Sequence, residues 1–228
     1  QLEFIEACKT HGKRPRVVFS SSRLVYGETG LTPVAESYPP APLSIYAAHK
    51  LCVENYLGVF GKSGVIDYTI CRISNAYGFD DSTRGQGYKI INLFIQRGLE
   101  NLPITLFGDG SQLRDLIHIH DLVDALLLCG NHPAAVNEVF NIGFGQSYSM
   151  IEAARMIQSM TGGTEISFRP WPREYLLVES GDFVGDISKA RNLLGFSPSF
   201  DLEAGLNQTV EDYRRIYDNS LEGVTTHV

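Results

Sequence analysis

Apolar runs and helical periods alternate along the first third of the chain. The apolar run "PRVVFSSS" covers residues 15–22, and a second, "VIDYTICRI", covers 65–73. Both are typical of strands buried on both faces of a parallel sheet. Residues 1–11 and 44–60 instead have the apolar spacing of amphipathic helices. A helix, a strand, a helix and a strand in this order predict a right-handed parallel crossover and an α/β fold.

The rest of the chain predicts shorter elements. We expect helices over 87–100, 120–130, 149–160, 186–195 and 201–217, and strands over 103–110, 116–119, 139–145 and 165–172. The helix at 186–195 has both ends marked, by Asp186 as its N-cap and by Gly195 as its stop. A polar tail follows the last helix, and we expect it to be flexible.

Tyr46 and Lys50 form the first candidate site, in the stretch "SIYAAHKLCVENYL". Side chains four residues apart in a helix are neighbours on one face. Tyrosine ordinarily has a pKa of about 10, and an ammonium a few ångströms away favours the phenolate. Such a pair can act as a general base that takes the proton of a sugar hydroxyl while hydride leaves the carbon. The alternative is a tyrosine packed on the core beside a lysine that reaches water.

Three serines, Ser20, Ser21 and Ser22, end the first predicted strand. Ligands of open α/β sheets bind at the carboxyl ends of the strands. A serine hydroxyl at this edge can therefore hydrogen-bond the same substrate oxygen as the tyrosine. Serine runs are also common in turns and helix caps, and the sequence leaves that alternative open.

The charge balance disfavours some partners. Lys and Arg number 19 against 26 Asp and Glu, a formal net charge of −7 with no basic block, which disfavours nucleic acid. No apolar run is long enough to cross a bilayer, and we expect no signal peptide. The four cysteines are widely spaced in apolar stretches and form no Cys-x-x-Cys pair. They predict buried free thiols and a reducing, cytoplasmic compartment.

A series of motifs in a fixed order makes the chain resemble a known family. The motifs are "FSSSRLVYG", the Tyr-x-x-x-Lys pair with Glu54 beyond it, "CRISNAYG", "ITLFGDGSQLRDLIHIHDLVDALL", "VFNIG" and "GDISKARNLLGFSP". Together they resemble the extended short-chain dehydrogenase/reductase family, within it the NAD-dependent nucleotide-sugar epimerases and dehydratases, and most of all the UDP-glucose 4-epimerases. The resemblance covers residue 1 to about 217.

The resemblance implies roles at the redox end of the site. Tyr46 would be the acid/base, and Lys50 would favour its phenolate and bond the nicotinamide ribose of NAD, with NADP less expected. Ser22 would hold the reacting oxygen, and Ser20 would lie beside the cofactor. The resemblance also implies a nucleotide-sugar substrate and a homodimer formed by the helix that carries Tyr46 together with residues 1–11.

Four further residues would bind the substrate if the resemblance holds. Asn75 would contact its sugar or phosphate, and Asn92 would lie in the segment that lines the nucleotide pocket. Arg114 would pair with the diphosphate, which suits a guanidinium fork. Arg173 would be a second phosphate arginine or, equally, a surface residue.

The segment "HIHD" invites a metal interpretation, with Asp121 as a third ligand beside His118 and His120. The two histidines would point to one face of a strand. The resemblance instead makes these residues structural and capping positions. We therefore expect no metal.

The chain departs from the family at two places. Hexose 4,6-dehydratases carry an Asp-Glu pair after the active-site Ser or Thr, whereas Arg23 and Leu24 stand here, which disfavours 4,6-dehydration. The 4-epimerases commonly have a small residue and Thr there. The family also begins with a Gly-x-x-Gly-x-x-Gly turn that receives the cofactor pyrophosphate, and this chain contains none.

The domain organisation follows from the resemblance. Residues 1–78 would be the C-terminal part of a Rossmann-like dinucleotide-binding domain whose glycine-rich N-terminal half is absent. Residues 79–217 would mostly form a smaller α/β substrate-binding domain, with core elements returning near 115–145, and 218–228 would be the flexible tail. The chain would then be a piece of a longer protein or a truncated gene product.

The leading functional hypothesis is an NAD-dependent nucleotide-sugar epimerase that works through a transient keto-sugar. The same chemistry also serves nucleotide-uronic acid decarboxylases, epimerases at other carbons and nucleotide-sugar reductases. A truncated, non-catalytic domain that binds sugar nucleotides is an alternative from a different class. The missing glycine turn favours it, whereas the intact Ser22, Tyr46, Lys50 and Arg114 oppose it.

Overall fold

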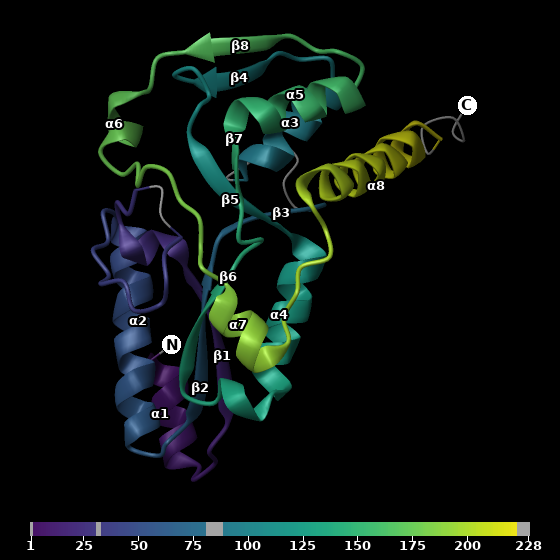
Figure 1. Ribbon diagram of the computed structural model, residues 1–228. Helices are drawn as coiled ribbons and strands as arrows, with labels where there is room; N and C mark the ends of the chain where they lie inside the picture. Colours follow the sequence, from purple (N-terminus) through teal and green to yellow (C-terminus); the bar gives the residue numbers. More distant parts are fainter. Residues whose placement is uncertain (1, 31–32, 81–88, 223–228) are drawn as a thin grey trace.

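A three-stranded parallel sheet carries the first part of the chain (Figure 1). The computed structural model describes residues 2–30, 33–80 and 89–222. Its first elements are α1 (Leu2–Thr10), β1 (Arg16–Ser22), η1 (Arg23–Tyr26), α2 (Ile45–Lys62) and β2 (Asp67–Ile73). β1 and β2 are parallel over their full lengths, and β6 (Glu138–Ile142) joins β2 on its other side. The predicted strand–helix–strand crossover and the α/β fold are confirmed.

Helices cover both faces of this sheet. α1 and α2 lie on one face, and α4 (Ile119–Asn131) and α7 (Ser188–Leu194) lie on the other (Figure 1). The α2 side is closed by apolar residues that include Ile5, Phe19 and Leu57. The α4 side includes Cys71 and Cys129, which are buried free thiols. Burial on both faces explains why β1 and β2 are continuous apolar runs rather than alternating ones.

The remaining elements form a second layered unit. They are β3 (Asn75–Tyr77), α3 (Ile90–Leu99), β4 (Ile104–Phe107), β5 (Leu113–His118), η3 (Pro133–Ala135), β7 (Ser147–Ser149), α5 (Met150–Met160), β8 (Ile166–Arg169), α6 (Arg173–Leu176) and α8 (Leu202–Glu222). β5 lies between β3 and β7, and β4 pairs with β8. α3, α5 and α8 pack together over one apolar core at this end of the molecule (Figure 1).

Several element boundaries differ from the prediction, among them those of β5, α7 and α8. β5 begins at Leu113, before the expected strand at 116–119. α7 begins at Ser188, with Ile187 instead of Asp186 as its N-cap, and the Asp186 carboxylate accepts a hydrogen bond from the Ser188 N–H at 2.9 Å. The last helix ends at Glu222, so it extends into the segment expected as a tail; residues 223–228 lie outside the described ones. Within the described chain, no helix is long and apolar enough to span a membrane.

α2 is the element that positions the predicted acid/base pair. It begins after Ser44, whose hydroxyl accepts the Ala47 N–H at 3.2 Å and so acts as a side-chain N-cap. The helix buries Val53 and Leu57 against the sheet. Its N-terminal turns lie beside the carboxyl end of β1, where ligands of open α/β sheets bind.

Candidate active site

Lys50 reaches from α2 to the carboxyl end of β1. Its Nζ donates a 2.6 Å hydrogen bond to the backbone carbonyl of Ser20. The same ammonium lies 5.0 Å from the centroid of the Phe19 ring and 5.5 Å from that of the Tyr46 ring. Partial burial lowers the pKa of Lys50 below its ordinary value. The structure therefore brings together Lys50, Tyr46 and the serine end of β1.

Tyr46 is open to solvent, with 54% of the residue exposed. This exposure argues against the alternative in which the ring packs on the core and has no chemical task. The ring is held on the helix face next to Lys50, as the four-residue spacing predicts. A substrate hydroxyl can thus approach the phenol from solvent.

The three serines at the end of β1 have three different surroundings. Ser20 is exposed and gives its carbonyl to Lys50. Ser21 is buried, and its hydroxyl donates to the carboxylate of Glu54. The Ser22 Oγ accepts the Leu24 N–H at 3.2 Å and caps η1. The capping alternative is therefore real for Ser22, but a hydroxyl that accepts from the backbone keeps its own proton for a second partner.

A buried ion pair fixes α2 against the sheet. Glu54 on α2 and Arg72 on β2 are both nearly inaccessible, and Arg72 Nη2 lies 2.7 Å from Glu54 Oε2. The guanidinium also lies over the Tyr26 ring, 4.7 Å from its centroid. Tyr26 in turn donates its phenolic hydrogen to Asn141 at 2.7 Å. Glu54 is one helical turn beyond Lys50, so this network fixes the part of α2 that carries Lys50.

Asn75 and Arg23 meet at the start of β3. Arg23 Nε donates to Asn75 Oδ1 at 2.9 Å, and Arg23 Nη1 donates to the hydroxyl of Ser180 at 2.9 Å. From the sequence, Asn75 was predicted to contact the substrate, whereas Arg23 was noted only because it departs from the family pattern. The structure places the two side chains in contact, and Arg23 directly follows Ser22 in the chain.

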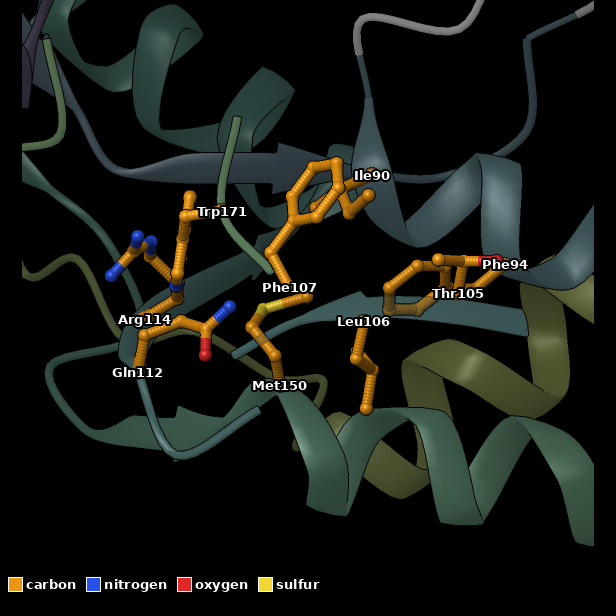
Figure 2. A pocket seen from close by; sticks show the side chains of 9 residues that line it. All are labelled: Ile90, Phe94, Thr105, Leu106, Phe107, Gln112, Arg114, Met150 and Trp171. Carbon is orange, nitrogen blue, oxygen red and sulfur yellow. The ribbon is translucent and has the colours of Figure 1, made fainter. Parts of the chain in front are cut away.

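Arg114 is buried and already has partners. Its Nη2 lies 2.6 Å from Glu179 Oε1, and its Nη1 donates to the carbonyls of Leu113 and Gly181. It also lines a cavity of about 180 Å³ between β4, β5, α3 and α5 (Figure 2). Arg114, which was predicted to bind the diphosphate, thus lies at the wall of a cavity. The Glu179 carboxylate occupies the guanidinium N–H groups that a diphosphate would use.

Aromatic rings form another wall of this cavity. Phe107 and Trp171 face each other with centroids 5.4 Å apart (Figure 2). A larger hollow of about 540 Å³ shares Phe107 with the first one and includes Arg97 and Arg169. The sequence did not single out Phe107, Arg97 or Arg169, because they lie on three elements whose proximity no local pattern indicates.

Asn92 and Arg173 have less direct relations to these cavities. Asn92 is buried in α3, and its amide donates to the Gly78 carbonyl at 2.6 Å and accepts the Gly78 N–H at 3.3 Å. This pairing fixes the end of β3 to α3, which is a structural task. Arg173 begins α6 and is exposed, between Trp171 and Tyr175, which both line the cavities.

The buried carboxylate of Asp115 joins β5 to the segments around Phe144 and Gly185. Its carboxylate accepts the N–H groups of Phe144 at 2.8 Å and Gly185 at 3.1 Å. Burial raises the pKa of Asp115 to about 6. Gly143 is required here, since a Cβ at that position would lie 2.5 Å from the Asp115 carboxylate.

The "HIHD" segment has structural contacts at each polar position. His118 Nδ1 accepts the His120 N–H at 3.4 Å at the start of α4. Asp121 accepts the N–H groups of Ser199 and Phe200, at 2.8 and 3.0 Å. Among the residues that the structure describes, no cluster of His, Cys, Asp and Glu has the grouping of a metal site.

A parallel sheet covered by helices, with a Tyr-x-x-x-Lys helix beside the serine end of a strand, defines the short-chain dehydrogenase/reductase class. Within that class the chain belongs to the NAD dependent epimerase/dehydratase family, whose model matches residues 1–143. The predicted resemblance to extended nucleotide-sugar epimerases is confirmed.

Relatives support the same assignment. The chain is 35% identical over 196 residues to a putative UDP-glucose 4-epimerase of Methanocaldococcus jannaschii. That match covers 86% of this chain and 62% of the relative, so the chain spans less than two thirds of that protein. The crystal structure of UDP-glucose 4-epimerase with UDP-glucose from Thermotoga maritima has a TM-score of 0.86 at 30% identity, over 95% of this chain and 68% of that one. MoeE5 in complex with UDP-glucuronic acid and NAD has a TM-score of 0.82 at 30% identity, over 93% and 69%.

Proposed function

We propose that this chain carries the acid/base group and the substrate pocket of an NAD-dependent epimerase. The enzyme would invert a nucleotide-diphosphate sugar at C4 through a transient keto-sugar. The observation that supports this most is the Lys50 ammonium, which is held on the Ser20 carbonyl beside the exposed ring of Tyr46.

The residues at this edge fit the nicotinamide end of the cofactor. An ammonium has three donors, and the bond to Ser20 uses one, so Lys50 can also bond ribose hydroxyls. NAD, when bound, supplies a hydride acceptor at the reacting carbon and returns the hydride to the other face of the sugar. The glycine turn for its pyrophosphate is not in this sequence.

Tyr46 and Ser22 would handle the proton at the reacting oxygen. The Tyr46 phenolate takes the hydroxyl proton, and the Lys50 ammonium stabilises that phenolate electrostatically. The Ser22 hydroxyl donates to the same oxygen and keeps it in line with Tyr46. The keto-sugar then turns its other face to the cofactor, and Tyr46 gives the proton back.

The nucleotide would occupy the cavities beyond the sugar. The Phe107–Trp171 wall offers a surface against which a base can stack. Arg114 would bind the diphosphate in place of Glu179, which now takes its Nη2. Asn75 keeps its amide N–H groups for the substrate, since Arg23 bonds only its oxygen. Arg173 and Asn92 are weaker candidates for the same region.

An assay of UDP-sugars with the full-length protein tests the reaction. We expect interconversion of UDP-glucose and its 4-epimer with no net change in NADH absorbance, because the hydride returns to the substrate. Net consumption of NADH would identify a reductase, and release of carbon dioxide from UDP-glucuronic acid would identify a decarboxylase. Calorimetric binding of UDP-glucose without NAD binding or turnover would favour the non-catalytic alternative.

We propose that α1 and α2 form a homodimer interface. Exposed apolar residues gather on these two helices, among them Phe4 at 55% and Val59 at 66% exposure. α1 and α2 lie side by side on one face of the sheet (Figure 1). A second copy would bury this surface, since a large exposed apolar patch usually marks an interaction site.

Val59→Glu is expected to weaken the dimer by at least about tenfold, because an unpaired charge in an apolar interface costs several kcal/mol. Sedimentation equilibrium of the full-length protein measures the change. Val123→Glu is the matched control, since Val123 is 45% exposed on α4, across the sheet. Equal effects of the two substitutions, or a monomeric parent, would refute this interface.

The four free thiols remain the argument for a cytoplasmic location.

A further inference from the structure

Arg23 is a buried guanidinium whose hydrogen-bond partners are neutral. Only 6% of the residue is exposed. Among the described residues its hydrogen bonds engage Nε, with Asn75 Oδ1, and Nη1, with the Ser180 hydroxyl. No carboxylate of those residues lies within 4.0 Å of it. The other two arginines that are buried in the described part of the chain differ, because Arg72 pairs with Glu54 and Arg114 with Glu179.

The surroundings of Arg23 disfavour its charge. Burial and the nearby positive Arg114 lower the pKa of Arg23 to about 10, although the more distant carboxylates of Glu179 and Asp115 act in the opposite direction. Glu179 is already engaged by Arg114 and the Gly181 N–H. The Phe183 ring, with its centroid 5.1 Å from the guanidinium carbon, gives a cation–π contact that offsets only part of the cost of burial. A buried charge without a directly paired carboxylate is costly, so an anion supplied by a ligand would stabilise this arrangement.

The place of Arg23 in the chain indicates which anion this is. Arg23 directly follows Ser22, to which we assign the oxygen at C4 of the sugar. In a hexopyranose C6 is attached to C5, the ring neighbour of C4, whereas C1, which carries the diphosphate, is on the opposite side of the ring. Nη2 and the second N–H of Nη1 form a fork of the kind that binds a carboxylate in bidentate geometry.

We propose that Arg23 binds a carboxylate at C6 of the sugar, so that the enzyme prefers a nucleotide-uronic acid to a neutral nucleotide sugar. The inference rests on the proposed function, because that function puts the sugar between Ser22 and Asn75. Asn75 and Ser180 orient the guanidinium through Nε and one N–H of Nη1, which leaves Nη2 and the second N–H of Nη1 for the ligand.

The experiment compares UDP-glucuronic acid with UDP-glucose on the full-length protein with NAD. Calorimetry gives the affinity for each, and product analysis gives the turnover separately. The unchanged protein is expected to bind UDP-glucuronic acid at least about tenfold more tightly. Arg23→Gln should lower the affinity for UDP-glucuronic acid by about 10- to 100-fold, the range expected for a hydrogen bond to a buried charge. The loss of affinity for UDP-glucose should be smaller by a factor of at least about three.

Two further variants separate binding from packing. Ser180→Ala removes one neutral partner but keeps the guanidinium, and it should keep the preference. Arg23→Lys keeps the charge without the fork, and an intermediate preference is expected. Thermal melting of each variant reports its fold.

Several outcomes would overturn the inference. One is an unchanged protein with no preference for the uronic acid, which decides the question even if Arg23→Gln does not fold. Another is an equal loss for both ligands in Arg23→Gln, which would assign Arg23 to the diphosphate or to packing. Charge-selective binding without turnover of either ligand would instead refute the proposed epimerase and leave the role of Arg23 intact.

Discussion

Tyr46→Phe in the full-length protein is expected to lower kcat for nucleotide-sugar epimerisation by at least about 100-fold, the usual contribution of a general acid/base. The substitution removes one oxygen and keeps the ring. Because Tyr46 is 54% exposed, little packing is lost, and the melting temperature should stay close to that of the parent. Lys50 keeps its bond to the Ser20 carbonyl, so the cofactor end of the site is retained.

Tyr56→Phe is the control for this variant. Tyr56 is on the same helix and is also partly exposed, so its substitution has the same chemistry at a position outside the site. Both proteins are assayed with saturating UDP-sugar, and NAD content is measured in each. Wild-type-like kcat in Tyr46→Phe, with NAD bound, would refute Tyr46 as the proton carrier.

Local signals in the sequence were sufficient for the elements that hold this tyrosine. Ser44 at a helix start and the four-residue spacing of Tyr46 and Lys50 each depend on contacts within one or two turns. The parallel pairing of β1 with β2 follows from their continuous apolar runs and the helix between them. Such features are predictable because their causes lie within a few residues.

The partners of the polar side chains were not predictable. Arg23 meets Ser180 across 157 positions of the chain, and Arg114 meets Glu179 across 65. A motif names the residue type at a position, but the charge opposite it depends on how distant loops pack. Asn92 illustrates the same limit. Its sequence position predicted a place in the nucleotide pocket, whereas its side-chain amide hydrogen-bonds the backbone of Gly78.

Glu54→Met is expected to lower the free energy of unfolding by about 3–5 kcal/mol, because it leaves Arg72 as an unpaired buried charge. Both side chains of this pair are less than a tenth exposed. The Ser21 hydroxyl also loses its acceptor. Urea denaturation followed by circular dichroism measures the loss. Glu138→Met is the control: its bridge to Lys189 is partly solvated, so we expect less than about 1 kcal/mol.

The double variant Glu54→Met with Arg72→Met separates the two contributions of this pair. Removing both charges leaves no unpaired ion, and we expect it to recover most of the stability lost in Glu54→Met. Activity should not recover equally, because the pair ties α2, which carries Tyr46 and Lys50, to β2 and to Ser21. A stable double variant with parental kcat would mean that the ion pair has no part in positioning α2. A single variant that loses less than about 1 kcal/mol would mean that water or an anion reaches Arg72 in solution.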